Sequence, residues 1–161
     1  VITALICAGK IGSGIGAELG SMRVTEQIDA MEVSGTNPFK YLVVTRVFAC
    51  MLMIPILGVL ADAISLYGSY LGANIRGVIS WQLLWSQVWG VIAYSDFLPA
   101  VIKTYFFGFA IGIVGCYKGF NTSGGTEGVG RSANSAVVIA SLFVFIIDLI
   151  AVQITDALSL N

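Results

Sequence analysis

The sequence predicts an all-α, polytopic membrane protein, and three observations indicate this fold class. Hydrophobic residues make up 57% of the 161 positions, and charged residues make up only 11%. The mean hydropathy is +0.92, and a soluble domain carries about 25% charged residues, so these charges are too few to cover a surface in water. The apolar runs are continuous and do not alternate with polar residues, which predicts membrane-spanning helices rather than the strands of a barrel.

The first expected element is a partial membrane helix at residues 1–16. Because the chain does not begin with Met and Val1 already lies in an apolar run, we expect an N-terminally truncated chain with about four membrane segments. Glycines recur at every fourth position, at Gly12, Gly16 and Gly20. This spacing favours close helix packing in lipid over a nucleotide-binding loop, which needs a preceding strand and a G-x-G-x-x-G pattern.

The second element is a charged stretch, which we expect to form a cytoplasmic coupling helix and turn at residues 17–41. Seven of the seventeen charged residues lie between Ala17 and Arg46, and apolar segments flank this stretch on both sides. Apolar and polar positions alternate at helical spacing as far as about Val33, and Gly35 with the Asn-Pro pair after it is a helix stop signal. The stretch therefore predicts an amphipathic helix outside the lipid.

Three further spans are predicted, at residues 42–72, 97–117 and 136–158. The first of them is about thirty residues long, whereas a span needs about twenty, so we expect it to be tilted or kinked at Pro55. In the second, Gly108 and Gly112 form another pair of small residues at the spacing of a helix-packing face.

Two connections join these spans. Residues 73–96 contain Trp81, Trp85 and Trp89 on one helical face, which favours an outer-side connector lying in the membrane interface. A short buried helix is the alternative. Residues 118–135 are polar and rich in glycine, and we expect them to form a cytoplasmic loop.

Basic residues predict the orientation in the membrane. If the charged stretch is cytoplasmic, six Lys and Arg residues lie on or near that side, and only Arg76 lies on the other. The six are Lys10, Arg23, Lys40, Arg46, Lys118 and Arg131. An excess of basic residues marks the cytoplasmic side, so the C-terminus is expected on the outer side.

Lys103 and Asp148 are ionisable residues inside predicted spans. Such residues are costly in lipid, and they mark ion pairs or transport paths. With a rise of about 1.5 Å per residue in a hydrocarbon core about 30 Å thick, their depths agree to within about 3 Å. An ion pair is therefore feasible, and Asp62, nearer the outer surface, is the competing partner for Lys103. The pair either belongs to a transport path or only locks two helices, unless Lys103 extends outward to the interface.

The composition disfavours enzymatic, metal-binding and nucleic-acid-binding functions. There is no His, and no nucleophile–base or paired-carboxylate pattern is visible, so neither catalysis nor a metal site is expected. Cys7, Cys50 and Cys116 stand singly in apolar surroundings and are expected to be buried free thiols. A net charge of −1 without a basic cluster disfavours binding to nucleic acid.

Two long motifs resemble a known family. The first is AELGSMRVTEQIDAMEVSGTNPFKYLVVTRV, and the second is VGCYKGFNTSGGTEGVGRSANSAVV. Together, and in this order, they resemble the hallmark segments of the MlaE (YrbE) family of ABC-transporter permeases, which includes Mce-associated and chloroplast lipid-transporter permeases. The resemblance covers nearly the whole chain and implies an MlaE-type permease domain.

The resemblance implies a homodimeric, multi-pass permease of a bacterial inner membrane. It implies a cytoplasmic ABC ATPase that binds ATP and Mg, so that no cofactor is expected in this chain, and an MCE-domain lipid-binding protein on the outer side. The implied cargo is phospholipid, moved between the inner and outer membranes and so linked to outer-membrane lipid asymmetry. Family members have an N-terminal interfacial helix and about five spans, so the expected truncation would remove that helix, the first span and part of the second.

An ATPase needs a rigid lever on the permease, and the amphipathic helix is suited to that role. We expect polar residues of this helix to contact the ATPase, although some of them only face water. The candidates are Glu18, Arg23, Glu26, Gln27 and Glu32.

Two alternative functions stay open. The chain is either a permease for another hydrophobic cargo, such as a sterol or a solvent, or a structural membrane anchor without a path of its own. A lipid-sized cavity at a dimer interface would favour a permease, and a close-packed interface would favour an anchor.

Overall fold

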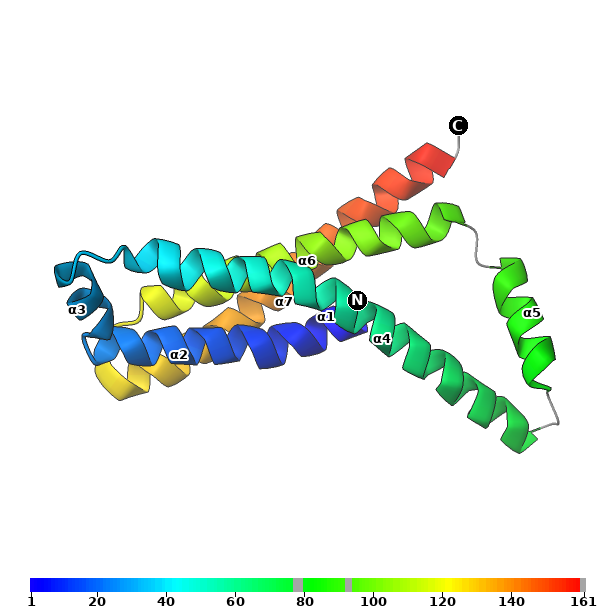
Figure 1. Cartoon of the computed structure of the whole chain (residues 1–161), viewed down its shortest axis with the longest axis horizontal. Helices are drawn as coiled ribbons and strands as arrows, with labels where there is room; N and C mark the ends of the chain where they lie inside the picture. The colour runs from blue at the N-terminus through cyan, green and yellow to red at the C-terminus, as the bar shows by residue number, and fades with distance from the viewer. Residues whose placement is uncertain (77–79, 92–93, 160–161) are drawn as a thin grey trace.

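The computed structural model describes residues 1–76, 80–91 and 94–159, and in these residues it contains helices and no strand. Figure 1 shows an elongated bundle in which α3 lies at one end and α5 at the other. The helices are α1 (Ile2–Cys7), α2 (Ser13–Val24), α3 (Gln27–Val33), α4 (Thr45–Arg76), α5 (Trp81–Val91), α6 (Tyr94–Phe120) and α7 (Gly125–Ser159). A π-helical turn, η1 (Ala8–Gly12), joins α1 to α2, and a second, η2 (Phe39–Val44), leads into α4.

Four helices are long and apolar enough to cross a membrane, judged by length and composition. They are Ile2–Val24, Phe39–Ile75, Pro99–Phe120 and Gly125–Ala157. Each helix is longer than about 18 residues, the length that marks a candidate span. The all-α, polytopic fold class predicted from the sequence is therefore confirmed.

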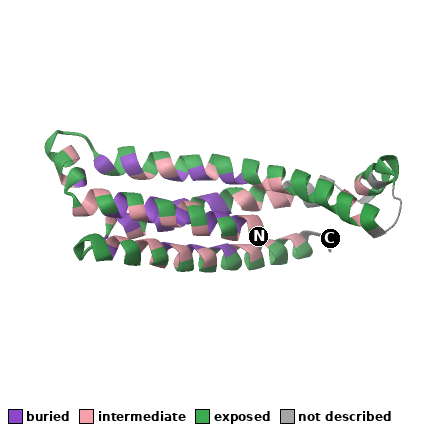
Figure 2. Cartoon of the chain, turned by 90° about the horizontal axis from the view of Figure 1, so that it is seen from below, coloured by how far each residue is buried: buried purple, intermediate pink, exposed green. Residues whose placement is uncertain are grey.

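The core of the bundle surrounds α6, which packs against α2, α4 and α7. Its largest fully buried side chains come from five helices: Leu19, Ile28, Ile54, Phe107, Ile111, Cys116 and Val144. Figure 2 shows the buried residues concentrated in the part of the bundle toward α3, while the part toward α5 is mostly exposed. Many of the exposed side chains are large and apolar, as expected where lipid rather than water surrounds a helix.

Glycines bring α6 and α4 into backbone contact. A Cβ atom placed on Gly108 would lie 2.6 Å from the carbonyl oxygen of Cys50, and one on Gly112 would lie 3.0 Å from the Cα atom of Val47. No larger side chain fits at either position without moving the opposite backbone. The two helices thus approach each other as small residues allow in lipid.

Gly16 and Gly20 of the first membrane helix face α7 and the turn before it. A Cβ atom on Gly16 would lie 3.3 Å from the Cβ atom of Ala136, and one on Gly20 would lie 2.8 Å from the hydroxyl oxygen of Thr122. Gly12 is less confined, because its nearest neighbouring atom would be 3.8 Å away. The predicted packing face is therefore tightest toward Gly20.

The predicted amphipathic helix from Ala17 to about Val33 is wrong in its boundaries. The first membrane helix continues to Val24, and α3 is a separate helix of seven residues. Between them Glu26 adopts a left-handed conformation, with φ of 59°. A left-handed residue cannot continue an α-helix, so the chain turns there. The turn after α3 does include Gly35, with φ of 81°, as the stop signal predicted.

The predicted cytoplasmic loop at residues 118–135 is also mostly wrong. α6 continues to Phe120, and α7 begins at Gly125, so only a short turn separates the two helices. Gly124 and Gly125 have φ of 89° and 68° and form this turn. The other glycines of the stretch lie in helices, and Gly119 among them lies against α2, a close approach that small residues allow in lipid.

α4 loses its contacts with the core beyond Pro55, which lies within the helix. No described residue of α4 after Pro55 is buried, and Figure 1 shows α4 and α6 separating toward α5. Gly68 and Gly72 would meet no neighbouring atom within 4 Å, unlike the glycines of α6.

α5 forms part of the predicted connector at residues 73–96, of which residues 77–79 and 92–93 lie outside the described residues. The ring of Trp81 lies 5.0 Å from that of Tyr70 and 5.8 Å from that of Trp85, which in turn lies 5.9 Å from Trp89. All three tryptophans are exposed within the chain. A location in the membrane interface stays a prediction.

Candidate functional site

An ion pair joins α6 and α7 inside the apolar part of the bundle. The Lys103 ammonium donates a hydrogen bond to a carboxylate oxygen of Asp148 at 3.1 Å. The exposed fractions of the two side chains are 27% and 24%, so both charges are largely withdrawn from the surroundings. Within lipid each charge is costly alone, and pairing offsets part of that cost.

Asp62 lies near this pair but does not bind Lys103. Together with Lys103 and Thr104, the Asp62 side chain lines a cavity of about 230 Å³ between α1, α4 and α6. Among the described residues, the carboxylate within ion-pair distance of Lys103 belongs to Asp148. The cavity therefore places a second acidic group beside the pair.

α3 and the turn before it form the end of the bundle opposite α5. Ile28 is 1% exposed and anchors α3 in the core, where α3 packs against α2. On the other side, Glu26, Gln27 and Glu32 are exposed, and Val33 is exposed by 90%. These four residues form a free surface, which we call the α3 surface.

Two of the predicted coupling residues are already paired within the chain. Arg23 forms an ion pair with Asp29 across the break between α2 and α3. Glu18 lies in α2 rather than on the α3 surface. Its carboxylate forms an ion pair with the guanidinium of Arg46 of α4, with 2.7 Å between the nitrogen and the oxygen. The structure therefore groups Glu26, Gln27 and Glu32 on one exposed surface, whereas Glu18 lies apart in α2 and the Arg23 side chain is engaged by Asp29 of α3.

Two features of the site were missed in the sequence. Gly115 and Gly119 continue the stripe of Gly108 and Gly112 along α6, but they face α2: a Cβ atom on Gly119 would lie 2.6 Å from that of Leu19. Their spacing of seven from the first pair was the available signal.

The second missed feature is a polar contact across the turn between α6 and α7. The Thr122 side chain is buried, and its hydroxyl lies 2.8 Å from that of Ser132 and 3.2 Å from the Lys118 carbonyl. A loop at residues 118–135 would leave Thr122 without a fixed partner, so the sequence pattern does not predict this contact.

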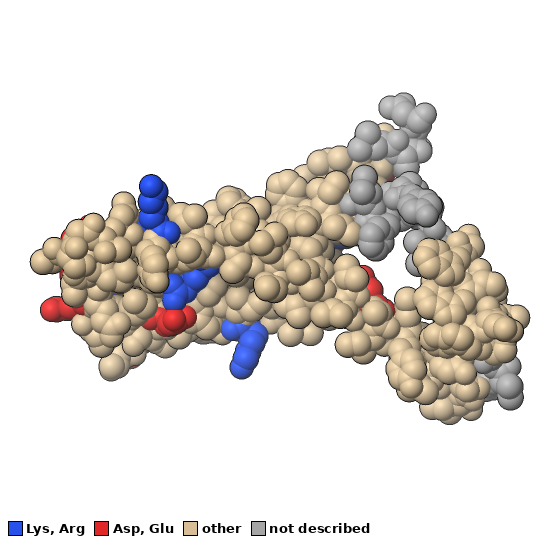
Figure 3. Space-filling model, viewed as in Figure 1, with Lys and Arg blue, Asp and Glu red and all other residues tan. Residues whose placement is uncertain are grey.

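Charged side chains gather at the α3 end of the molecule. Figure 3 shows most of the charged atoms on the visible face at this end, with few toward α5. Five of the eight basic residues lie in the segments at this end: Arg23 in the last turn of α2, Lys40 in η2, Arg46 at the start of α4, Lys118 in the last turn of α6 and Arg131 in the second turn of α7. Under the positive-inside rule it is the end expected in the cytoplasm.

Candidate metal ligands and cysteine thiols were located among the described residues. In the part of the chain that the structure describes, no group of three or more His, Cys, Asp and Glu residues could hold a metal ion. Cys7, Cys50 and Cys116 are free and buried, as predicted.

Comparison with known proteins extends this picture. The family model described as "Permease MlaE" matches residues 1–154. A "Probable ABC transporter permease protein" of Pyropia yezoensis is 40% identical over 150 residues, which are 93% of this chain and 57% of that protein. A protein of Synechocystis with the same description is 40% identical over 146 residues, which are 91% of this chain and 56% of that protein.

A plant protein is also similar. "Protein TRIGALACTOSYLDIACYLGLYCEROL 1, chloroplastic" of Arabidopsis thaliana is 36% identical over 150 residues, which are 93% of this chain and 43% of that protein. The chain thus spans about half the length of the curated relatives it matches.

Proposed function

Because the chain belongs to the MlaE family of permeases, we propose that it is the membrane subunit of an ABC transporter that moves phospholipids between the inner and outer membranes of a bacterium. A separate cytoplasmic ATPase drives the movement by binding ATP and Mg and hydrolysing ATP. The observation that carries this proposal is the family match over residues 1–154, which includes every candidate span but the last turn of α7. The name of the Arabidopsis relative contains that of a diacylglycerol glycolipid, which supports a lipid as the cargo.

The α3 surface supports the ATPase as a partner. α3 is a short helix that is fixed to the core through Ile28, and its outer residues are exposed. An exposed Val33 among polar residues is suited to a protein contact, because the centre of a protein interface is apolar and its rim is polar. We infer that Glu26, Gln27, Glu32 and Val33 meet the ATPase.

The remaining partners are a second copy of the chain and an MCE-domain protein. α7 exposes large apolar side chains along most of its length, including Leu142, Phe145 and Leu149. Such a face needs either lipid or another helix, and a homodimer would provide one. The MCE-domain protein would bind at the α5 end and receive the lipid there.

We infer that the pair of Lys103 and Asp148 acts on the transport path. It lies on the same part of α6 as the cavity that Asp62 lines, in the half of the bundle where α4 separates from α6. A polar group at this depth is costly, and its retention inside a span is typical of a functional residue.

Reconstitution tests the function. The full-length permease would be purified with its ATPase and MCE-domain partner and placed in vesicles that contain fluorescent phospholipid. The proposal expects ATP-dependent transfer of phospholipid to the MCE-domain protein, and no transfer with an ATPase variant that cannot hydrolyse ATP. Absence of transfer with the intact ATPase would refute the proposed function.

The same preparation separates the alternatives. Native mass spectrometry of the purified permease identifies the bound lipids. Phospholipid in the complex supports the proposed cargo, and a sterol or another hydrophobe in its place identifies a different one. A purified permease that holds no lipid, and that shows no ATP-dependent lipid transfer, would indicate a structural anchor.

A further inference from the structure

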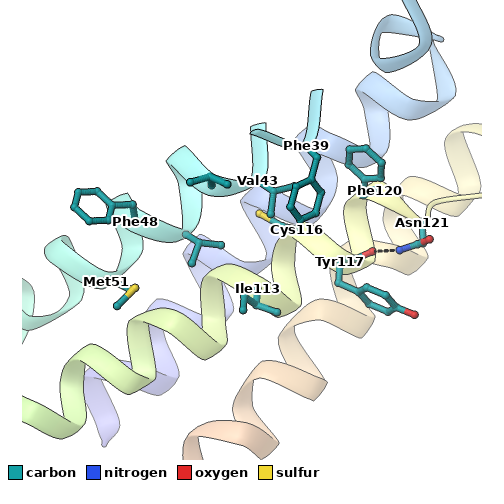
Figure 4. Close-up of a pocket in the computed structure, with 11 residues that line it drawn as sticks. Phe39, Val43, Phe48, Met51, Ile113, Cys116, Tyr117, Phe120 and Asn121 are labelled. Carbon is teal, nitrogen blue, oxygen red and sulfur yellow. Dashed lines mark hydrogen bonds between the residues drawn. The ribbon is translucent and has the colours of Figure 1, made fainter. Parts of the chain in front are cut away.

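An open apolar groove lies between the α4 side of the bundle and the C-terminal half of α6. Its volume of about 530 Å³ falls within the about 300–1,000 Å³ typical of ligand pockets. Figure 4 shows Phe48 and Met51 toward one end of the groove, and Phe39 and Phe120 toward the other. Apart from Asn121 and the Tyr117 hydroxyl, the side chains that line it are apolar.

A polar pocket adjoins the groove at the α3 end. It has a volume of about 280 Å³ and lies between the last turn of α6 and the first turns of α7. It is lined by Lys118 and Arg131 and by hydroxyl and amide side chains, namely Tyr117, Asn121, Ser123, Ser132 and Ser135. Tyr117 and Asn121 line both cavities, so the groove and the pocket share part of their walls.

The polar pocket carries a net positive charge. Lys118 and Arg131 contribute two positive charges. The neighbouring Glu127 contributes one negative charge, and its carboxylate accepts a hydrogen bond from Arg131 at 3.3 Å. That ion pair is weak, because its side chains are 79% and 85% exposed. Among the described residues, no carboxylate lies within ion-pair distance of Lys118.

We propose that the groove and the polar pocket together bind one anionic phospholipid of the cytoplasmic leaflet. An acyl chain occupies the groove, and the phosphate lies against Lys118 and Arg131, with the serine hydroxyls as further donors. The proposal rests on the proposed function for its cargo, and it adds a binding site at the cytoplasmic end of the permease. Phospholipid is the occupant because it joins an apolar chain to an anion, as the groove joins the cationic pocket.

A helix of a second copy is the competing occupant of the groove. It would cover Val43, Phe48 and Met51 equally well. It would not account for two cationic side chains and several hydroxyls at the end of the groove, because an apolar helix offers them neither a negative charge nor hydrogen-bond partners. Charge therefore favours the lipid.

Photo-crosslinking tests this site without measuring transport. The full-length permease would be incubated in vesicles that contain phosphatidylglycerol with a diazirine in one acyl chain, and the labelled peptides would be identified by mass spectrometry. The proposal expects labelling of the groove residues to exceed that of exposed Val138 on α7, whose side chain lies outside both cavities. Diacylglycerol with the same chain, which lacks the phosphate, should label the groove weakly.

Two variants examine the two halves of the site. Val43→Trp fills the groove and should abolish groove labelling, whereas Val138→Trp should not change it. Lys118→Gln with Arg131→Gln should lower groove labelling by about fivefold for each charge removed. A matched loss of two charges elsewhere, Lys10→Gln with Arg76→Gln, should leave the labelling unchanged.

Three results would overturn the proposal. They are equal labelling of the groove and of Val138, equal labelling by diacylglycerol and phosphatidylglycerol, and dissociation of permease copies by Val43→Trp without loss of lipid labelling. The last would assign the groove to a second copy. Failure here and failure of the proposed function are separable, because lipid transfer in reconstituted vesicles is measured independently of the crosslink.

Discussion

The Lys103 ammonium lies 3.1 Å from the Asp148 carboxylate and joins the first half of α6 to the second half of α7. An unpaired charge at the centre of a membrane helix costs about 2.5–3.5 kcal/mol on insertion scales. Removing one partner should therefore cost more than removing both. This asymmetry gives a test that separates stability from transport.

Asp148→Asn is expected to destabilise the permease by up to about 3 kcal/mol, because Lys103 keeps its charge without a partner. The double variant Lys103→Gln with Asp148→Asn should recover most of this loss. The measurement is the unfolding midpoint of the purified protein in detergent. A double variant whose loss equals the sum of the losses of Asp148→Asn and Lys103→Gln alone would show that the pair contributes no coupling energy.

Transport by the stable double variant then decides the role of the pair. If the pair belongs to the transport path, phospholipid transfer should fall by at least tenfold although folding and assembly are retained, since about 1.4 kcal/mol of lost stabilisation already has that effect. Normal transfer would assign the pair to helix locking alone.

The α3 surface should carry the contact with the ATPase. Glu26→Lys with Glu32→Lys reverses two exposed charges and should weaken binding of the ATPase by about tenfold or more, because misplaced charges at an interface are repelled. Co-purification at increasing salt measures the effect. The control is Glu127→Lys, which changes another exposed acid at the same end of the bundle, on α7. Equal weakening by both changes would point to general electrostatics instead of the α3 surface.

The sequence predicted the helical class and the depth of the ion pair, but not the rotation of its helices. Residue rise gives depth, so Lys103 and Asp148 could be matched. Which acid Lys103 meets depends on the direction that each helix face takes, and that is decided by packing around Gly108 and Gly112. Asp62 consequently stayed a candidate until the structure was known.

The two boundary errors have separate causes. The left-handed Glu26 has no marker in the sequence, because glycine or asparagine is the residue that usually adopts this conformation. The glycines of residues 118–135 were interpreted by their turn propensity, but Gly119 lies in α6 because α2 approaches it closely. Local propensity is weaker than tertiary packing at such contacts.

Gly108 offers a test of this packing. Gly108→Ala should destabilise the bundle by about 1–3 kcal/mol, because its Cβ atom would lie 2.6 Å from a Cys50 oxygen and 2.8 Å from the Cα atom of Met51. The same change at Gly68 of α4 meets no atom within 4 Å and should be neutral or stabilising by up to about 1 kcal/mol. Unfolding midpoints of the two variants provide the comparison, and a similar midpoint for both would contradict the close approach of α4 and α6.

Orientation in the membrane follows from the basic residues of the α3 end and can be measured by thiol labelling. Ser123→Cys, in the turn before α7, should react with a membrane-impermeant maleimide only after the inner membrane is opened. Ser80→Cys, just before α5, should react as soon as the outer membrane is permeable, because the basic residues predict that the α5 end faces outward. The native thiols Cys7, Cys50 and Cys116 are buried, so the parent protein should give a low background in both conditions. Labelling of Ser123→Cys from the outside would reverse the orientation, and the α3 surface would then be unable to meet a cytoplasmic ATPase.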